Sequence, residues 1–320
     1  MSAYRVVVTD QVFPSVDLER ELLGEIGAEL TVASGRRDEV VEAARDADAL
    51  LNTYLAVDAE FIGALRSCKI IARYGIGVDN IDLDAARKAG IAVTNVPDYS
   101  VEEVAAHALA LLLMQLRRLP EGLDTVRAGQ WGIERVRPLP RLSELTVGLI
   151  GFGRIARRLA RSLQALDMRC VVFDPYLPED ARSALASEQV RFVDDLDEVL
   201  AADALSLHCP LTPETRGIIG REQLAKLPAH AVLVNTSRGP LVDIEALIEA
   251  LESGAIRGAA LDVVVPEPPD DPARLSEVPG LLVTPHMAFY SDAALRESQR
   301  KATAQVIKAL TGQELDYRVA

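Results

Sequence analysis

The stretch that most constrains the fold of this chain runs from residue 145 to residue 176. An apolar segment, LTVGLI at 145–150, is followed by a glycine-rich turn, GFGRIA at 151–156, and then by residues with helical spacing. A second apolar segment, RCVVF at 169–173, ends at an acid, Asp174. This order of strand, turn, helix and strand predicts a parallel βαβ unit.

The turn of this unit has the pattern G-x-G-x-x-G/A in the context that a dinucleotide site requires. Gly151 permits the tight turn, Gly153 lets the backbone approach a pyrophosphate, and the small Ala156 lets helix and strand pack closely. The helix N-terminus, at Arg154 and Ile155, then presents free N–H groups to the phosphates. A βαβ crossover without a ligand is the alternative interpretation.

The acid at the end of the second strand predicts which dinucleotide binds. Asp174 lies roughly 20 residues after the glycines, where a carboxylate accepts hydrogen bonds from the ribose hydroxyls of NAD. The same charge would repel the 2′-phosphate of NADP. We therefore expect NAD to be the cofactor.

Bulk properties exclude several classes of protein. The 320 residues suit two domains of ordinary size. The net charge of −14 argues against nucleic acid or an anionic membrane as a partner, because either would need a basic face. The three cysteines stand singly, so neither a metal site nor a disulfide framework is indicated. No signal peptide precedes the first strand, and the longest apolar run, 104–116, is too short to span a bilayer. We expect a cytoplasmic protein.

Strand and helix patterns alternate along the chain, which indicates parallel sheets covered by helices. In the first hundred residues the expected strands are 4–9, 29–32, 48–52, 70–73 and 91–94, and the expected helices are 17–25, 37–45, 58–66 and 82–88. SVEE at 100–103 predicts a capping box that opens a long helix, 101–117, and a polar, arginine-rich connection, 118–144, follows. The later strands are expected at 145–150, 169–173, 190–193, 203–207, 231–235, 258–263 and 281–284, with a last helix at 291–311.

The position of the glycine turn predicts the domain organisation. The turn comes after a complete α/β unit, and one helix is left over after the last strand. The simplest arrangement inserts a Rossmann cofactor domain, residues 101–291, into a flavodoxin-like substrate domain, residues 1–100 plus 292–320. The predicted fold class is α/β, with two doubly wound parallel sheets. In such a fold the active site lies in the cleft at the carboxyl ends of the strands.

Several expected strands of the second half end in polar or charged residues. Arg238, His286 and His208 each follow one, Asp262 lies at the end of another, and Glu267 comes shortly after Asp262. Hydride transfer to a 2-keto acid needs a cation for the carboxylate, a proton donor with a near-neutral pKa, and a carboxylate that orients this donor. Arg238, His286 and Glu267 match these three needs. His208 is the alternative catalytic histidine, although no acid is placed to orient it.

Nine segments resemble, in order and spacing, the D-isomer-specific 2-hydroxyacid dehydrogenase family over essentially the whole chain. They are RYGIGVDNID at 73–82, NVP at 95–97, GFGRI at 151–155, DPY at 174–176, HCP at 208–210, NTSRG at 235–239, ALD at 260–262, EP at 267–268 and TPH at 284–286.

The resemblance implies an NAD-dependent oxidoreductase that interconverts a 2-keto acid and its D-2-hydroxy acid. It implies that Arg238 binds substrate, that His286 is the general acid/base and that Glu267 is its partner. The implied cofactor contacts are Gly151, Gly153, Arg154, Ile155, Asp174, His208, Cys209, Pro210, Thr236, Ser237, Arg238, Asp262 and His286. The implied substrate contacts are Tyr54, Ile76, Gly77, Arg238, His286 and Phe289.

Some details resemble one branch of this family, the C-terminal-binding proteins, which are transcriptional corepressors. These are HMAFYS at 286–291, ALLNTY at 49–54 and DPYL at 174–177. The corepressors carry Trp where this chain has Phe289, so the match is incomplete. The alternative function is therefore an NAD(H)-sensing, corepressor-like binding protein with weak dehydrogenase activity.

Two further expectations concern the substrate and the assembly. Phosphoglycerate-oxidising members use arginine in the loop after the third strand, but this loop, NTYLAV at 52–57, has no basic residue, and the chain stops without room for a regulatory domain. We expect a substrate with an uncharged side chain, small or moderately apolar. The helix 101–117 is apolar around much of its circumference, which predicts spare surface for a homodimer.

Overall fold

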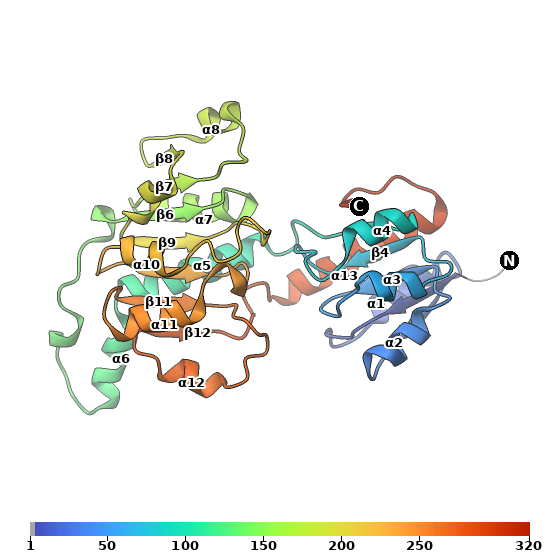
Figure 1. The fold of residues 1–320 in the computed structure, drawn as a ribbon, viewed down its shortest axis with the longest axis horizontal. Helices are drawn as coiled ribbons and strands as arrows, with labels where there is room; N and C mark the ends of the chain where they lie inside the picture. The colour runs from blue at the N-terminus through green and yellow to red at the C-terminus, as the bar shows by residue number, and fades with distance from the viewer. Residues whose placement is uncertain (1–3) are drawn as a thin grey trace. The chain divides into compact units, whose positions relative to one another are not determined.

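A computed structural model describes residues 4–320. The chain divides into two compact units, each of which combines a parallel sheet with covering helices (Figure 1). The first unit comprises Met1–Ser100 together with Ser291–Ala320, and the second comprises Val101–Tyr290.

The sheet of the first unit has five parallel strands in the order β2-β1-β3-β4-β5, which is the flavodoxin-like order. Its strands are β1 (Arg5–Val8), β2 (Glu29–Val32), β3 (Ala49–Asn52), β4 (Ile70–Arg73) and β5 (Ala92–Thr94). Its helices are α1 (Asp17–Gly24), α2 (Arg37–Ala44), α3 (Ala59–Ala64), α4 (Leu83–Ala89) and α13 (Asp292–Thr311).

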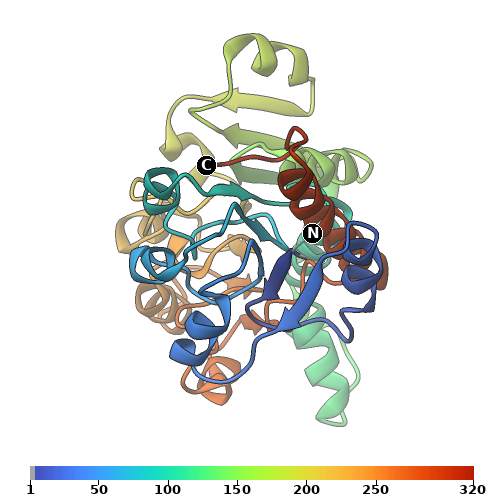
Figure 2. The same cartoon turned by 90° about the vertical axis from the view of Figure 1, so that its right-hand side faces the viewer.

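Both faces of this sheet are covered, and alternate strand residues enter two separate cores. Leu50 of β3 joins the core that includes Phe61 of α3, whereas Leu51 joins the core that includes Val306 of α13. The C-terminal helix α13 lies against β3 and β4 of the N-terminal sheet (Figures 1 and 2). The last segment of the chain therefore completes the first unit.

The sheet of the second unit has seven parallel strands in the order β12-β11-β10-β9-β6-β7-β8. They are β6 (Thr146–Ile150), β7 (Arg169–Phe173), β8 (Val190–Val193), β9 (Ala204–Leu207), β10 (Val232–Asn235), β11 (Gly258–Leu261) and β12 (Leu281–Val283). The helices are α5 (Val101–Leu116), α6 (Leu119–Arg127), α7 (Arg154–Gln164), α8 (Glu179–Leu185), α9 (Leu196–Leu200), α10 (Arg221–Lys226), α11 (Ile244–Glu252) and α12 (Pro272–Glu277). The strand order reverses between β6 and β9, where ligands bind in folds of this kind.

Helix α5 begins at Val101 without the expected capping box. The hydroxyl oxygen of Ser100 is buried and has no hydrogen-bond partner in the described structure, so this prediction is wrong. Glu102 and Glu103 still lie in the first turn, where the helix dipole favours negative charge.

The connection after α5 contains more structure than its polar composition predicts. It includes α6 and two short 3₁₀ turns, at Glu134–Val136 and Leu142–Glu144. Pro120 and Gly122, which usually mark a loop, lie within α6 and weaken its helical pattern. The large apolar side chains exposed here are Leu119, Leu123, Val126, Trp131 and Ile133.

The spare apolar surface expected on α5 is found on α6 and the segment after it. Among the described residues, no large apolar side chain of α5 is exposed, because the helix packs against α7 and the sheet. Within residues 4–320, no helix combines the length and apolar content needed to cross a bilayer.

Candidate active site

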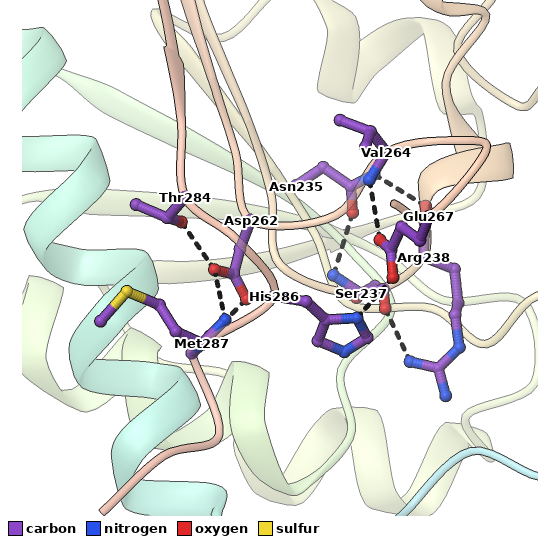
Figure 3. A network of polar contacts seen from close by, with 10 residues as sticks. Asn235, Ser237, Arg238, Asp262, Val264, Glu267, Thr284, His286 and Met287 are labelled. Carbon is purple, nitrogen blue, oxygen red and sulfur yellow. Dashed lines mark hydrogen bonds and ion pairs between the residues drawn. The ribbon is translucent and has the colours of Figure 1, made fainter. Parts of the chain in front are cut away.

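The polar residues predicted for catalysis follow three adjacent strands of the seven-stranded sheet (Figure 3). Arg238 comes after β10, Glu267 after β11 and His286 after β12. Because all three strands are parallel, their carboxyl ends lie on the same edge of the sheet. The structure therefore gathers residues that lie far apart in the sequence.

His286 and Glu267 form a direct pair. The Nδ1 atom of His286 lies 2.6 Å from Oε2 of Glu267, and the other carboxylate oxygen accepts a 2.9 Å hydrogen bond from the backbone N–H of Val264. With Glu267 ionised, Nδ1 carries the hydrogen of this contact, and Nε2 is the ring nitrogen on the side away from Glu267. The pair thus fixes both the orientation and the tautomer of the imidazole.

The electrostatic setting keeps Glu267 ionised. Burial opposes its charge, but the hydrogen bond and charge of His286 outweigh this effect, with help from the Val264 N–H and the charge of Arg238. Together they lower the pKa of Glu267 below its usual value. A carboxylate in this state stabilises a protonated imidazole beside it.

The turn that carries Arg238 is held by Asn235, a role that the sequence interpretation missed. Asn235 is buried, its side-chain N–H donates to the carbonyl of Arg238 at 2.8 Å, and its side-chain oxygen accepts from the N–H of Ser237 at 3.0 Å. The Ser237 hydroxyl donates to the carbonyl of Leu207 at 2.8 Å and joins the turn to β9. The sequence signal that could have indicated this role is an amide side chain, that of Asn235, at the last position of a buried strand.

His286 stands in an unusual backbone conformation. Its φ is 51°, in the left-handed region, and its N–H donates to the carbonyl of Asp262 at 2.8 Å. The carboxylate of Asp262 is 1% exposed and accepts from the hydroxyl of Thr284 and from the N–H groups of Met287 and Ala288. In this structure Asp262 therefore organises the turn around His286.

Phe289 lies beside the candidate proton donor. Its ring is 6.0 Å from that of His286, in an edge-to-face arrangement with an interplanar angle of 80°. An apolar side chain thus stands next to the imidazole, as expected of a residue that lines a substrate pocket.

The alternative histidine, His208, is in a different state. Burial lowers its pKa to about 4, and its Nε2 atom lies 2.9 Å from the hydroxyl of Ser206. An imidazole of this kind is neutral at physiological pH, and its remaining N–H is too weakly acidic to serve as the proton donor. Its contacts thus favour His286 as the acid.

The glycine turn after β6 fits a dinucleotide. Gly151 has a φ of 87°, and a Cβ there would meet the backbone of His208 and Cys209 at 2.8 Å. A Cβ on Gly153 would meet no protein atom within 4 Å, so the protein itself gives no steric reason for glycine at this position. Helix α7 starts here with no side-chain cap, which leaves its first N–H groups for a phosphate.

Other predicted cofactor residues border the same edge. The carboxylate of Asp174 accepts from the N–H of Phe152 at 2.8 Å and from that of Tyr176 at 3.0 Å, so it also braces the glycine turn. The hydroxyl of Thr236 is buried without a hydrogen-bond partner in the described structure. Arg154 and Ile155 begin α7. In the HCP segment after β9, Cys209 is buried with its thiol pKa raised by burial to about 11, whereas Pro210 is exposed.

The predicted substrate residues of the first unit lie at the carboxyl edge of its own sheet. Tyr54 follows β3, and Ile76 and Gly77 follow β4. The carbonyl of Ile76 accepts from the Asn95 side chain at 2.7 Å. The carboxylate of Asp10 accepts from the N–H groups of residues 53, 54 and 55 and shapes their loop, a role that the sequence interpretation did not assign.

A cation also borders this edge. Arg73 ends β4, and its guanidinium occupies the space that a Cβ on Gly75 would need. Its Nε atom also lies 3.4 Å from the side-chain oxygen of Asn80. Arg73 was part of the recognised motif but had no assigned role. The predicted residues therefore fall into two sets. The catalytic and cofactor residues lie in the second unit, and Tyr54, Ile76 and Gly77 lie in the first.

Comparison with known proteins shows the family. The family model described as "D-isomer specific 2-hydroxyacid dehydrogenase, NAD binding domain" matches residues 109–288. A D-3-phosphoglycerate dehydrogenase from Methanocaldococcus jannaschii is 37% identical over 97% of this chain, and the match covers 58% of that protein. The chain thus spans little more than half the length of this relative. A hydroxypyruvate reductase from Thermotoga maritima is 35% identical over 97% of this chain and 98% of its own length.

The fold comparison agrees. A solved D-lactate dehydrogenase from Aquifex aeolicus, complexed with NAD and lactic acid, is 27% identical, and the match covers 96% of each chain with a TM-score of 0.86. The chain therefore belongs to the D-isomer-specific 2-hydroxyacid dehydrogenase family, and its second unit contains the NAD-binding domain of that family. The match does not assign the chain to the corepressor-like branch. These relatives are named as enzymes, and they do not support the corepressor alternative.

Proposed function

We propose that this protein is an NAD-dependent oxidoreductase that interconverts a 2-keto acid and its D-2-hydroxy acid. The contact of 2.6 Å between His286 and Glu267 carries the proposal, because it supplies an oriented proton donor with a paired carboxylate. The open space at Gly153 and the uncapped start of α7 support the cofactor assignment.

Each residue of the set has a distinct task. The bound cofactor supplies or accepts the hydride at the carbon that bears the oxygen. In the reducing direction, Nε2 of His286 gives a proton to this oxygen, and Glu267 stabilises the imidazolium before the transfer. Arg238 holds the carboxylate and the carbonyl oxygen of the substrate through its planar guanidinium. In the oxidising direction, His286 accepts the hydroxyl proton.

We assign the second unit, Val101–Tyr290, to the cofactor, and the first, Met1–Ser100 plus Ser291–Ala320, to the substrate. The backbone N–H groups near Ile76 and Gly77 would receive the substrate carboxylate, because a glycine-rich turn lets an anion approach the backbone. Tyr54 would border the substrate side chain. These roles are proposals that rest on the family resemblance.

The substrate that fits best has an uncharged side chain. The loop 52–57 contains no cation, and Phe289 places an apolar ring beside His286. A phosphate on the substrate would need a paired charge to offset its desolvation. We therefore favour small or moderately apolar 2-keto acids over phosphorylated ones.

Oxidation of 3-phosphoglycerate is the second candidate. The Methanocaldococcus jannaschii relative is a D-3-phosphoglycerate dehydrogenase, and Arg73 lies at the carboxyl edge of the first sheet. This arginine is our candidate partner for the phosphate. Loss of phosphoglycerate turnover in Arg73→Gln, with glyoxylate turnover retained, would favour this candidate.

We also propose a homodimer that works in the cytoplasm, without nucleic acid or membrane partners. The exposed apolar side chains of α6 and the following segment support the dimer, because Trp131 is 94% exposed and apolar patches of this kind mark contact surfaces. The net charge of −14 disfavours nucleic acid and anionic lipid. Light scattering at micromolar concentration should give twice the chain mass, and a monomer mass would contradict the dimer.

The direct test is a turnover screen. Glyoxylate, hydroxypyruvate, pyruvate, larger keto acids and 3-phosphoglycerate should be assayed with NADH or NAD as appropriate. We expect clear reduction of at least one uncharged keto acid, abolished in His286→Gln. Absence of turnover with all of them, or full activity in His286→Gln, would reject the proposed reaction.

A further inference from the structure

One polar side chain on the apolar helix α5 is not explained by packing alone. His107 has a side chain that is 18% exposed, and its Nε2 atom lies 3.0 Å from the hydroxyl oxygen of Thr284. The same nitrogen is 3.5 Å from Oδ1 of the buried Asp262. This histidine therefore reaches the strand ends that carry the candidate site.

The hydrogen-bond directions in this contact are fixed by counting protons. The hydroxyl of Thr284 donates to Oδ1 of Asp262 at 2.6 Å. A hydroxyl has one hydrogen, so the oxygen of Thr284 must accept the hydrogen bond from His107. The Nε2 atom of His107 is consequently the protonated ring nitrogen.

The chain of hydrogen bonds ends on the residues next to His286. Asp262 accepts from the N–H of Met287 (Figure 3) and from that of Ala288, both at 2.9 Å. Thr284 precedes His286 by two positions, and Met287 and Ala288 directly follow it. Donors on both sides of His286 are thus tied to one carboxylate.

This arrangement matters because His286 itself has a left-handed backbone, with a φ of 51°. A non-glycine residue keeps such a conformation only when its surroundings enforce it. The carboxylate of Asp262 supplies this restraint. His107 donates to the hydroxyl of Thr284, and this hydroxyl in turn donates to Asp262. The network therefore joins α5 to the backbone that aims the imidazole.

We propose that His107 is a positioning residue, which acts through Thr284 and Asp262 to hold the turn that presents His286. The inference rests on the proposed function, because it takes His286 as the proton donor. Loss of His107 leaves the half-buried hydroxyl of Thr284 without its donor and lets this turn relax. Because small displacements of a reacting group are costly, we expect kcat to fall on the order of 10- to 100-fold.

The test compares three replacements at one position. Gln places an amide N–H near the location of Nε2 and can still donate to Thr284. Asn is polar but too short to reach, and Leu fills the space without a donor. We expect His107→Gln to retain most of the wild-type kcat, whereas His107→Asn and His107→Leu lose it, with little change in the Kd for NADH.

Gln115 provides a matched control on the same helix. Its side-chain N–H donates to the carbonyls of Ala259 at 2.7 Å and of Gly280 at 3.0 Å, near the amino ends of β11 and β12. Gln115→Leu removes hydrogen bonds from α5 to the same two strands, but at the end of the strands opposite to the candidate site. It should lower the Tm but leave kcat unchanged.

The outcomes separate this inference from the proposed function. If His107→Gln and His107→Asn have equal kcat, or if His107→Leu keeps the wild-type kcat, His107 does not position the site. If Gln115→Leu loses as much kcat as His107→Leu, the effect is general destabilisation and the inference fails. The variant His286→Gln, assayed alongside, tests the reaction itself. Full activity of His286→Gln would reject the proposed function. An inactive His286→Gln together with a fully active His107→Leu would reject only the inference about His107.

Discussion

Gly239 and Val264 approach so closely that a Cβ on Gly239 would lie 2.0 Å from the carbonyl oxygen of Val264. The contact joins the turn after β10, which carries Arg238, to the loop after β11, which carries Glu267. The N–H of the same Val264 donates to Glu267 at 2.9 Å. One close backbone contact thus supports both the turn that carries Arg238 and the loop that carries Glu267.

Gly239→Ala should therefore disrupt the site. The added methyl would meet backbone atoms, which cannot rotate away as a side chain can, so one of the two loops must move. We expect kcat/KM to fall by at least about 100-fold, because a displacement on the order of 1 Å can cost this much. Steady-state kinetics of the variant would check this, with Gly24→Ala as a comparison, because a Cβ on Gly24 would meet nothing within 4 Å and its backbone is not left-handed. Unchanged kinetics in Gly239→Ala would show that the loops adjust freely.

Glu267→Gln should move the pH profile of keto-acid reduction. The pKa of Glu267 is held below its usual value, so its carboxylate is charged throughout the neutral range. Without this charge the imidazolium of His286 is less favoured, and the fall in reduction rate with rising pH should begin about 1 pH unit lower. The measurement is kcat/KM for reduction from about pH 5 to about pH 9, which includes the range in which histidine titrates. An unchanged profile would mean that Glu267 is not the partner.

Replacement of Asp174 should weaken the preference for NADH over NADPH. The variant Asp174→Ala loses the repulsion of the 2′-phosphate, but it also leaves the N–H of Phe152 without its acceptor. We therefore expect the ratio of kcat/KM values to move toward NADPH while the value for NADH itself falls. Asp174→Asn keeps an acceptor oxygen and should lose less with NADH. If the unmodified protein uses both cofactors equally, the NAD assignment of Asp174 is wrong.

His208 should make the protein less stable in mild acid. Burial lowers its pKa from 6.5 to about 4, so between these values the unfolded chain binds a proton that the folded chain does not. The free energy of unfolding then falls as the pH drops through this window, by at most about 3 kcal/mol. The free energy of unfolding can be measured by urea unfolding followed by circular dichroism at about pH 7 and about pH 5. The loss of this free energy between the two pH values should be smaller in His208→Gln than in the unmodified protein. Identical pH dependence in both proteins would contradict the buried neutral state.

Phe289→Gly should change the ranking of substrates more than it changes the rate with glyoxylate. Glyoxylate has no side chain to contact the ring, whereas larger keto acids would lose an apolar wall beside His286. The change in kcat/KM for an apolar substrate should be about 10- to 100-fold, the range expected for small apolar contacts. Equal effects on glyoxylate and on larger substrates would place Phe289 outside the pocket.

Much of the fold follows from local patterns. The expected strands agree with the observed ones to within two residues at each end, because alternating apolar runs and helical spacing are encoded in short segments. The helix α6 was missed, since Pro120 and Gly122 within it are typical of a loop. The capping box at Ser100 was wrong because a capping motif in the sequence does not ensure that the side chain turns toward the helix.

The residue types of the candidate site were also visible in the sequence. Arg238, Glu267 and His286 stand just after apolar strands, where parallel sheets collect functional side chains. The glycines at 151 and 153 could be interpreted from spacing and context alone. From the sequence, Glu267 was the expected partner of His286, and no acid was expected beside His208.

Only the tertiary structure decided the contacts among these residues. The sequence by itself determined which segments are strands and which polar residues end them, because periodicity and turn residues act over a few positions. It could not show that Asn235 holds the Arg238 turn, that burial keeps His208 neutral, or that His107 reaches Thr284 from another helix. Those features depend on strand order, register and packing between distant segments, and hydrogen bonds between such segments have no periodic signal in the chain.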